Sequence, residues 1–328
     1  MTATKQRDTS LDIICGLLII HMILGHLVYN FDGLPESAFF KWEEKLLFFF
    51  MPWFFFKNGM FYHPDNDNKA FISRNYHRLI VPFIIWSVIG EIVRWIGVAF
   101  SEHALDIRWY IISIKTIFTE GAIVGNGPLW FLLSLFLSRI LYNVFARNRI
   151  SAAILMTVSV LIPMLCWKFG FNQFRIIGHT LLGLFYFGCG FLLRNKQRDS
   201  HVIALSGVGL FITTLISHVY ISMVHNAVIF GDYYIFGVIS SLFAVILVNN
   251  MIPPGATRFL PCKILGYIGK HSMEFYVTHW VFIEVVKLLL VRLLGLPLDF
   301  TMFWIILALC ITLLPLSVKL LKVHTKLL

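Results

Sequence analysis

Long apolar stretches make up most of the chain, and polar residues gather in the short stretches between them. A helix needs about 20 mostly apolar residues to cross the hydrocarbon core of a bilayer. The pattern therefore predicts an all-α, polytopic integral membrane protein with about ten transmembrane helices. No soluble stretch and no internal repeat interrupts the series, so residues 1–328 are expected to form a single domain. The predicted spans cover about 10–30, 44–62, 78–100, 126–146, 149–168, 174–194, 201–222, 232–251, 272–294 and 300–320.

Two stretches depart from a simple span. The second span contains "FFFMPWFFFKNGMFY", in which Pro52 and Lys57 interrupt the apolar run, so we expect this helix to be kinked or broken. Between the third and fourth spans, "DIRWYIISIKTIFTEGAIVGNG" is amphipathic and too broken to cross. Its pattern favours an interfacial or re-entrant segment.

Composition and charge support the membrane assignment. Hydrophobic side chains make up 58% of the chain and charged ones only 13%, which is outside the usual balance of soluble domains. The net charge of +10 would suggest nucleic-acid binding in a soluble protein, but here the basic residues lie mostly in short loops, where they set topology. We therefore expect no nucleic-acid partner.

Orientation follows from the loops that hold most of the 27 Lys and Arg residues. These are the termini and the loops after the second, fourth, sixth and eighth spans, which the positive-inside rule places in the cytoplasm. Both termini are therefore predicted to be cytoplasmic, and the connections around 223–231 and 295–299 to face outward. The expected location is the inner (plasma) membrane, as a multi-pass protein without a cleaved signal peptide.

The five cysteines show no spacing typical of a metal site or a disulfide framework, and most of them lie in apolar runs. They are interpreted as small buried residues, and no metal is expected.

Polar residues interrupt the first span, "LDIICGLLIIHMILGH" (11–26). On a helix Asp12 and His26 fall within about 40° of each other and about 21 Å apart along the axis, whereas His21 points to the opposite side. Ionisable side chains in hydrocarbon normally face a cavity or a partner. Two interpretations of each residue stay open. His26 either faces a site or only hydrogen-bonds a neighbouring helix, and Asp12 either takes part in chemistry or, with Ser10, caps the helix start.

The ninth span carries a second polar group. Tyr276 and His279 are three residues apart and share a helix face, which we assign to a cavity. Glu274 points away from His279, so it either joins the cavity or caps the helix. Trp130 either lines the same cavity or anchors its helix at the membrane interface.

The first span and the residues before it, "RDTSLDIICGLLIIHMILGH", resemble the start of membrane acyltransferase family 3. The resemblance is to the branch of fucose 4-O-acetylase-like and surface-polysaccharide O-acetyltransferases, which open with an acidic residue, a glycine, an aliphatic run and a Gly-His pair. Further stretches resemble the same branch in the same order along most of the chain. They are "MPWFFFKNGMF" (51–61), "RLIVPFIIW" (78–86), "GPLWFL" (127–132) and "SMEFYVTHW" (272–280).

The chain departs from the family pattern at several positions. The family usually has Arg or Lys eleven residues before the first-helix histidine, where this chain has Cys15, and often has His where this chain has Phe50. Lys57 stands where the family commonly has an uncharged residue. Either Lys57 or Arg7 is a candidate to substitute for the charge that is absent at Cys15.

The resemblance implies acyl transfer, usually of acetyl from cytoplasmic acetyl-CoA, to a sugar hydroxyl. The partners would be acyl-CoA, a cell-surface glycan or its lipid-linked precursor, and membrane lipid. A histidine can act as base or as acyl carrier, so His26, with Asp12, is the predicted catalytic residue. Arg78 and Arg74 are predicted to bind the donor phosphates, although topology alone would also explain them. The predicted acceptor-binding residues are His279, Tyr276, Trp130 and Glu274.

The main alternative is a transporter or flippase of a glycan or lipid-linked precursor, because about ten spans with buried polar groups would also describe one. Transporters often have two matching halves with interrupted helices at corresponding positions, and no such halves are visible in the sequence.

Overall fold

The computed structural model is all-helical, with no strand among the residues that it describes. Those residues are 9–28, 31, 37–100, 107–171, 174–196, 199–217, 234–253, 256, 259–297 and 299–324. The helices of the first half are α1 (Thr9–Val28), α2 (Ala38–Leu46), α3 (Phe50–Met60), α4 (Asn68–Asn75), η1 (Tyr76–Ile80), α5 (Val81–Ala99), α6 (Ile107–Thr119), η2 (Val124–Leu129) and α7 (Trp130–Phe145). Those of the second half are α8 (Arg149–Lys168), α9 (Arg175–Leu193), α10 (Ser200–Ser217), α11 (Tyr234–Met251), α12 (Leu260–Lys270), α13 (Ser272–Lys287), η4 (Leu288–Leu293) and α14 (Phe300–His324).

The predicted polytopic membrane fold is confirmed. In the described part of the chain, seven helical segments are long and apolar enough to cross a membrane. The predicted count of about ten stays a prediction, because α3 and the apolar part of α10 (Ser200–Ile216) are short and α13 carries charged residues. Both termini and the connection 223–231 lie outside the described residues, so the predicted orientation is untested. The seven segments are Thr9–Val28, Asn68–Ala99, Ile111–Phe145, Arg149–Lys168, Arg175–Leu193, Tyr234–Met251 and Phe300–Ser317.

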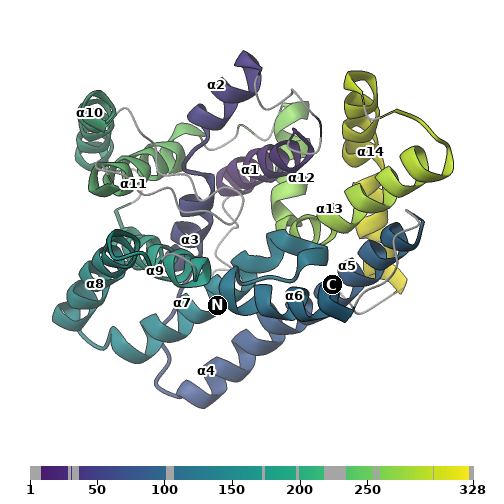
Figure 1. The fold of residues 1–328 in the computed structure, drawn as a ribbon. Helices are drawn as coiled ribbons and strands as arrows, with labels where there is room; N and C mark the ends of the chain where they lie inside the picture. Colours follow the sequence, from purple (N-terminus) through teal and green to yellow (C-terminus); the bar gives the residue numbers. More distant parts are fainter. Residues whose placement is uncertain are drawn as a thin grey trace.

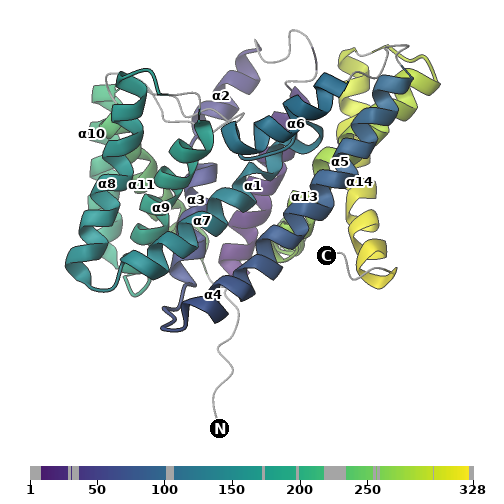
Figure 2. The same cartoon turned by 60° about the horizontal axis from the view of Figure 1, so that its bottom comes forward.

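The second predicted span is broken, as expected, but the break precedes the proline. Helix α2 ends at Leu46 and α3 begins at Phe50, so Pro52 lies in the first turn of α3. A proline is tolerated there because the first N–H groups of a helix have no partner within it. Helices α2 and α6 lie at the end of the molecule opposite α4 (Figure 2).

The amphipathic segment between the third and fourth spans is also broken. It forms α6 and η2, separated by a turn in which Gly121 has φ of +85°. Asn126 within η2 has non-helical backbone angles, φ −151° and ψ 72°. Although Ile111–Phe145 is apolar enough as a whole, only α7 continues as an uninterrupted helix beyond these breaks.

Helix α1 lies in the middle of the molecule, with α8 to α11 on one side and α5, α13 and α14 on the other (Figure 1). Its backbone contacts that of α12. A Cβ atom on Gly269 would come within 1.8 Å of the carbonyl oxygen of Asp12, and one on Gly16 within 2.0 Å of that of Leu265. Small residues permit such close packing between membrane helices. Most residues of α1 are buried.

Candidate functional site

The polar groups of the first and ninth predicted spans meet in the structure. His26, in the last turn of α1, has its ring centroid 5.2 Å from that of His279 on α13. The His26 ring also lies nearly perpendicular to the ring of Trp280, with 5.4 Å between the centroids. Two histidines from distant parts of the sequence therefore form one pair, which we call the histidine pair.

His279 is held in one tautomer. Its Nδ1 lies 2.7 Å from the backbone carbonyl oxygen of Tyr276, which can only accept a hydrogen bond. The hydrogen of the neutral ring is therefore assigned to Nδ1, and Nε2 keeps its lone pair. Nε2 is buried and has no hydrogen-bond partner among the described residues. An imidazole nitrogen in this state can take a proton from a hydroxyl group.

Tyr276 fixes the same helix to a second element. Its hydroxyl donates a hydrogen bond to the carbonyl oxygen of Pro128 in η2. The Tyr276 ring is buried and packs edge-on against Phe131, at 5.5 Å between centroids. Tyr276 thus contacts η2 through its side chain and His279 through its backbone carbonyl.

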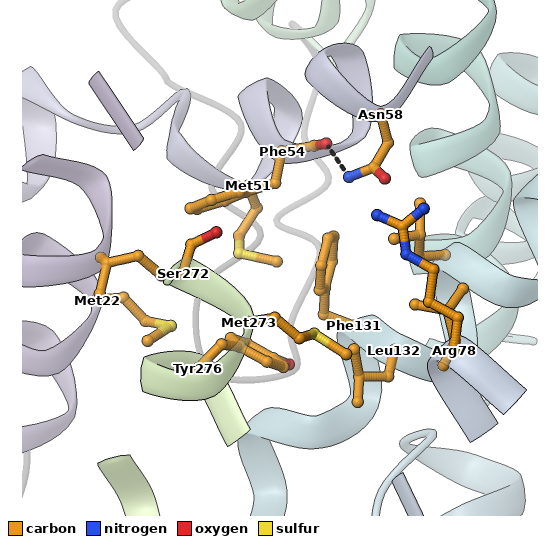
Figure 3. Close-up of a pocket in the computed structure, with 13 residues that line it drawn as sticks. Met22, Met51, Phe54, Asn58, Arg78, Phe131, Leu132, Ser272, Met273 and Tyr276 are labelled. Carbon is orange, nitrogen blue, oxygen red and sulfur yellow. Dashed lines mark hydrogen bonds between the residues drawn. The ribbon is translucent and has the colours of Figure 1, made fainter. Parts of the chain in front are cut away.

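A cavity of about 140 Å³ is lined in part by α1 and α13, the two helices that carry the histidine pair. Its walls come from α1, α3, η1, α7 and α13 and are mainly apolar, with three methionines (Figure 3). Apolar walls with a few polar groups are typical of small-molecule sites. The lining residues are Ile19, Met22, Met51, Phe54, Asn58, Arg78, Leu79, Phe131, Leu132, Leu135, Ser272, Met273 and Tyr276.

The histidine pair lies beyond the Met22 and Tyr276 side of the cavity. On α1, Met22 and His26 are four residues apart and fall on one stripe. On α13, Tyr276 and His279 are three apart and also share a face. The wall and the pair are thus separated by about one helical turn on both helices. Arg78 and Asn58 lie on the other side of the cavity from Met22 (Figure 3).

The two arginines predicted to bind the donor have different surroundings. Arg78 lines the cavity from the π-helical turn η1, and its side chain is exposed. Arg74 does not line the cavity. It forms an ion pair with Asp65 and is 61% exposed. The backbone N–H of Asp67 and the Arg74 guanidinium lower the pKa of the Asp65 carboxyl group. Arg74 is therefore engaged in holding the loop before α4.

Arg139 is a residue near the site that the sequence reasoning missed. It lies on α7, and its Nε donates a hydrogen bond of 2.6 Å to Oδ1 of Asn75. Arg78 is close enough for the two positive charges to repel each other. Among the described residues, neither arginine forms an ion pair with a carboxylate. The available signal was the position of Arg139 inside a predicted span, where a charge is costly unless it has a role.

Other predicted site residues lie away from the cavity wall. Asp12 is buried in the first turn of α1, where a carboxylate is favourable for the helix dipole. Trp130 stacks on His179, with 4.2 Å between ring centroids. Glu274, in the first turn of α13, lies 3.7 Å from Nδ1 of His271. The structure brings His26 to His279 and places Tyr276 and Arg78 on the cavity wall, which Asp12, Trp130 and Glu274 do not line.

The opposite face of α1 carries His21, as its position in the sequence predicts. His21 is buried against Phe50 and pairs with Glu43 of α2, so it does not contribute to the cavity wall. Lys57, a candidate to substitute at Cys15, lies with its Nζ 5.1 Å from the centre of the Trp53 ring. The other candidate, Arg7, lies outside the described residues.

Within the described part of the chain, no group of three or more His, Cys, Asp or Glu side chains is arranged to hold a metal ion. The histidine pair is accompanied by aromatic rings and backbone carbonyls instead.

Comparison with known proteins identifies a family that the sequence matches. A family model described as an acyltransferase domain, that of acyltransferase family 3, matches residues 8–321. The matched region includes α1, the cavity wall and the histidine pair. No curated protein and no solved structure matches the sequence.

Proposed function

Because the chain belongs to acyltransferase family 3, we propose that this membrane acyltransferase moves an acetyl group from cytoplasmic acetyl-CoA to a sugar hydroxyl. The proposed acceptor is a cell-surface glycan or its lipid-linked precursor, and the proposed location is the inner (plasma) membrane. One observation supports the chemistry above all others. The buried Nε2 of His279 keeps its lone pair beside His26, about one helical turn from an apolar cavity that Arg78 lines.

The donor is proposed to bind with its phosphates at Arg78 and Arg139. Arg78 is exposed, the two guanidinium groups are close, and neither is neutralised by a carboxylate in the described part of the chain. Phosphate oxygens would satisfy both arginines through charge-assisted hydrogen bonds. Arg74 is a weaker candidate, because Asp65 already neutralises it.

The cavity suits the thioester arm of the donor. Its volume of about 140 Å³ is close to that of an engineered apolar cavity of about 150 Å³ that binds benzene, so it has room for a segment of a thin flexible chain. Methionine side chains adapt to such a chain because they are unbranched and flexible. The arm would thus extend from Arg78 through the cavity toward the histidine pair.

The proposed reaction uses the histidine pair for proton transfer. Nε2 of His279 takes the proton of the acceptor hydroxyl as its oxygen attacks the thioester carbonyl carbon. The new C–O bond forms as the C–S bond breaks, and coenzyme A leaves as a thiolate. His26, which lies beside His279, is proposed to receive this proton from Nε2 of His279 and to deliver it to the sulfur, which returns both imidazoles to their starting states. An acyl group carried by His26 is the second route that the sequence left open.

Transfer of labelled acetyl from acetyl-CoA to glycan by the purified full-length protein in lipid nanodiscs tests the proposal. The wild type should label the glycan, and both His26→Ala and His279→Ala should not. The matched control is His21→Gln, which changes a buried histidine of α1 that faces Glu43 instead. Glycan movement across the bilayer that is indifferent to acetyl-CoA would favour the transporter and contradict the proposal.

A further inference from the structure

A carboxylate in the middle of α5 gathers hydrogen bonds from three elements. Oε1 of Glu91 accepts from Arg94 Nε and Trp95 Nε1, each at 2.9 Å, and from Ser113 Oγ of α6 at 3.0 Å. Oε2 accepts from the backbone N–H of Gly125 in η2 at 3.0 Å. The Glu91 side chain is only 13% exposed. A carboxylate within a membrane span is energetically costly, so one that is retained and hydrogen-bonded through both oxygens indicates a functional role for this residue.

The backbones of α5 and η2 touch at the same place. A Cβ atom on Gly90 would come within 2.6 Å of the Gly125 carbonyl oxygen, and one on Gly125 within 2.5 Å of the Glu91 nitrogen. Nδ2 of Asn126 also donates to the Trp86 carbonyl oxygen at 3.3 Å. The backbone of η2 is irregular at Asn126, the residue that makes this contact with α5.

A chain of hydrogen bonds leads from η2 to the histidine pair. Three residues after Gly125, the carbonyl oxygen of Pro128 accepts the hydroxyl hydrogen of Tyr276. The Tyr276 carbonyl oxygen in turn accepts the Nδ1 hydrogen of His279. A movement of η2 would displace the acceptor of Tyr276, and with it the group that sets the tautomer of His279.

We propose that Glu91 is a positioning residue for acyl transfer, which holds η2 against α5 and thereby orients Tyr276 and His279. The inference rests on the proposed function, since it gives Glu91 a role in the reaction of His279. Glu91 itself lies outside the cavity wall and contacts no reacting group.

Glu91→Gln tests this role, because glutamine keeps the size of the side chain but has only one oxygen and cannot accept the hydrogen bonds of all these donors. In the full chain, kcat should fall about tenfold, while KM for acetyl-CoA should change less than about twofold, because the donor phosphates bind elsewhere. The matched control is Glu284→Gln. Glu284 also pairs with a basic residue three positions later, Lys287 at 3.0 Å, and lies on the helix of His279. It should keep the wild-type kcat.

A double variant decides whether Glu91 acts through Tyr276. Tyr276→Phe removes the hydrogen bond to Pro128. Adding Glu91→Gln to this variant should therefore lower its kcat by less than about twofold. Residues that act through one network show such non-additive effects. Fully additive losses would overturn the inference, because Glu91 would then act independently of η2 and Tyr276.

Two measurements that need no turnover separate failure of this inference from failure of the proposed function. In Glu91→Gln, hydrogen exchange of the 124–129 segment should become faster, and His279 should react faster with diethylpyrocarbonate. Unchanged exchange and unchanged labelling would overturn the positioning role, whether or not the protein transfers acetyl. If Glu91→Gln does not fold, Asn126→Ala removes the second side-chain contact between η2 and α5 and should give the same changes.

Discussion

His26 and His279 lie with their rings 5.2 Å apart, although they belong to the first and the ninth predicted spans. The contact requires α1 and α13 to pack side by side, and it places a fixed, buried Nε2 next to a second imidazole. The arrangement explains why an apolar chain keeps two ionisable groups at this depth, where they are costly unless they serve a site.

The first prediction separates chemistry from binding. His279→Ala and His26→Ala should each lower kcat by at least about a hundredfold, within the usual contribution of a general acid or base. Coenzyme A affinity, measured by calorimetry, should stay within about twofold of wild type, because proton transfer occurs only on the reaction path. Loss of donor affinity in either variant, with wild-type turnover at saturating donor, would contradict the assignment.

The second prediction concerns the donor phosphates. Arg78→Ala and Arg139→Ala should each weaken coenzyme A binding by roughly ten- to a hundredfold, because a hydrogen bond to a charged group contributes about 1.5–3 kcal/mol. Arg74→Ala serves as the comparison, since Asp65 already occupies its guanidinium. Equal losses in Arg74→Ala and Arg78→Ala would indicate a general charge effect, not a phosphate site.

The third prediction concerns Tyr276. Tyr276→Phe leaves the Pro128 carbonyl oxygen without the hydroxyl donor and should destabilise the protein by about 1–3 kcal/mol. Thermal unfolding in nanodiscs measures the change. If the hydrogen bond also orients His279, kcat should fall by more than the loss of folded protein explains. An unchanged melting temperature would show that the hydroxyl does not hold α13 to η2.

The fourth prediction concerns the contact between α1 and α12. Gly269→Ala places a Cβ atom 1.8 Å from the carbonyl oxygen of Asp12, so the two helices must separate, at a cost of about 1–3 kcal/mol. Gly266→Ala on the same helix is the matched control. Its Cβ atom would find its nearest neighbour at 3.9 Å, so the substitution should be neutral or stabilising by up to about 1 kcal/mol. Melting temperatures of both variants check the difference.

The fifth prediction is a pH dependence at the loop before α4. The pKa of Asp65 is lower in the folded protein than the usual value of 3.8, through the N–H of Asp67 and the Arg74 guanidinium. Its ionised form therefore stabilises the fold above the unfolded pKa, and this contribution is lost as pH falls through the folded pKa. Asp65→Asn should melt below wild type at neutral pH, and the gap should close below about pH 3. If the difference in melting temperature between wild type and Asp65→Asn stayed constant across this pH range, ionisation of the Asp65 carboxylate would be excluded as the cause of that difference.

The sequence by itself determined the local features of this protein. The lengths of the apolar runs predicted most of the helices. A membrane-spanning segment must pair its backbone N–H and C=O groups within itself, whatever surrounds it, and a helix does so. The broken second span and the broken segment before α7 were predictable from Pro52, Lys57 and the glycines near 121–127. Helical periodicity also placed Tyr276 and His279 on one face and His21 on the face opposite His26.

Only the tertiary structure decided which polar groups meet. Lipid surrounds apolar helices as favourably as other helices do, so hydrophobic pattern does not specify their partners, and shape complementarity does. The glycine contacts of α12 with α1 and of η2 with α5 are such shape effects, and they arise between residues far apart in the sequence. The pairing of His26 with His279, the approach of Arg139 to Arg78 and the hydrogen bond that Gly125 donates to Glu91 all depend on that packing. The sequence gives the chemical groups that each of these side chains carries, and the packing of the helices determines which of those groups come into contact.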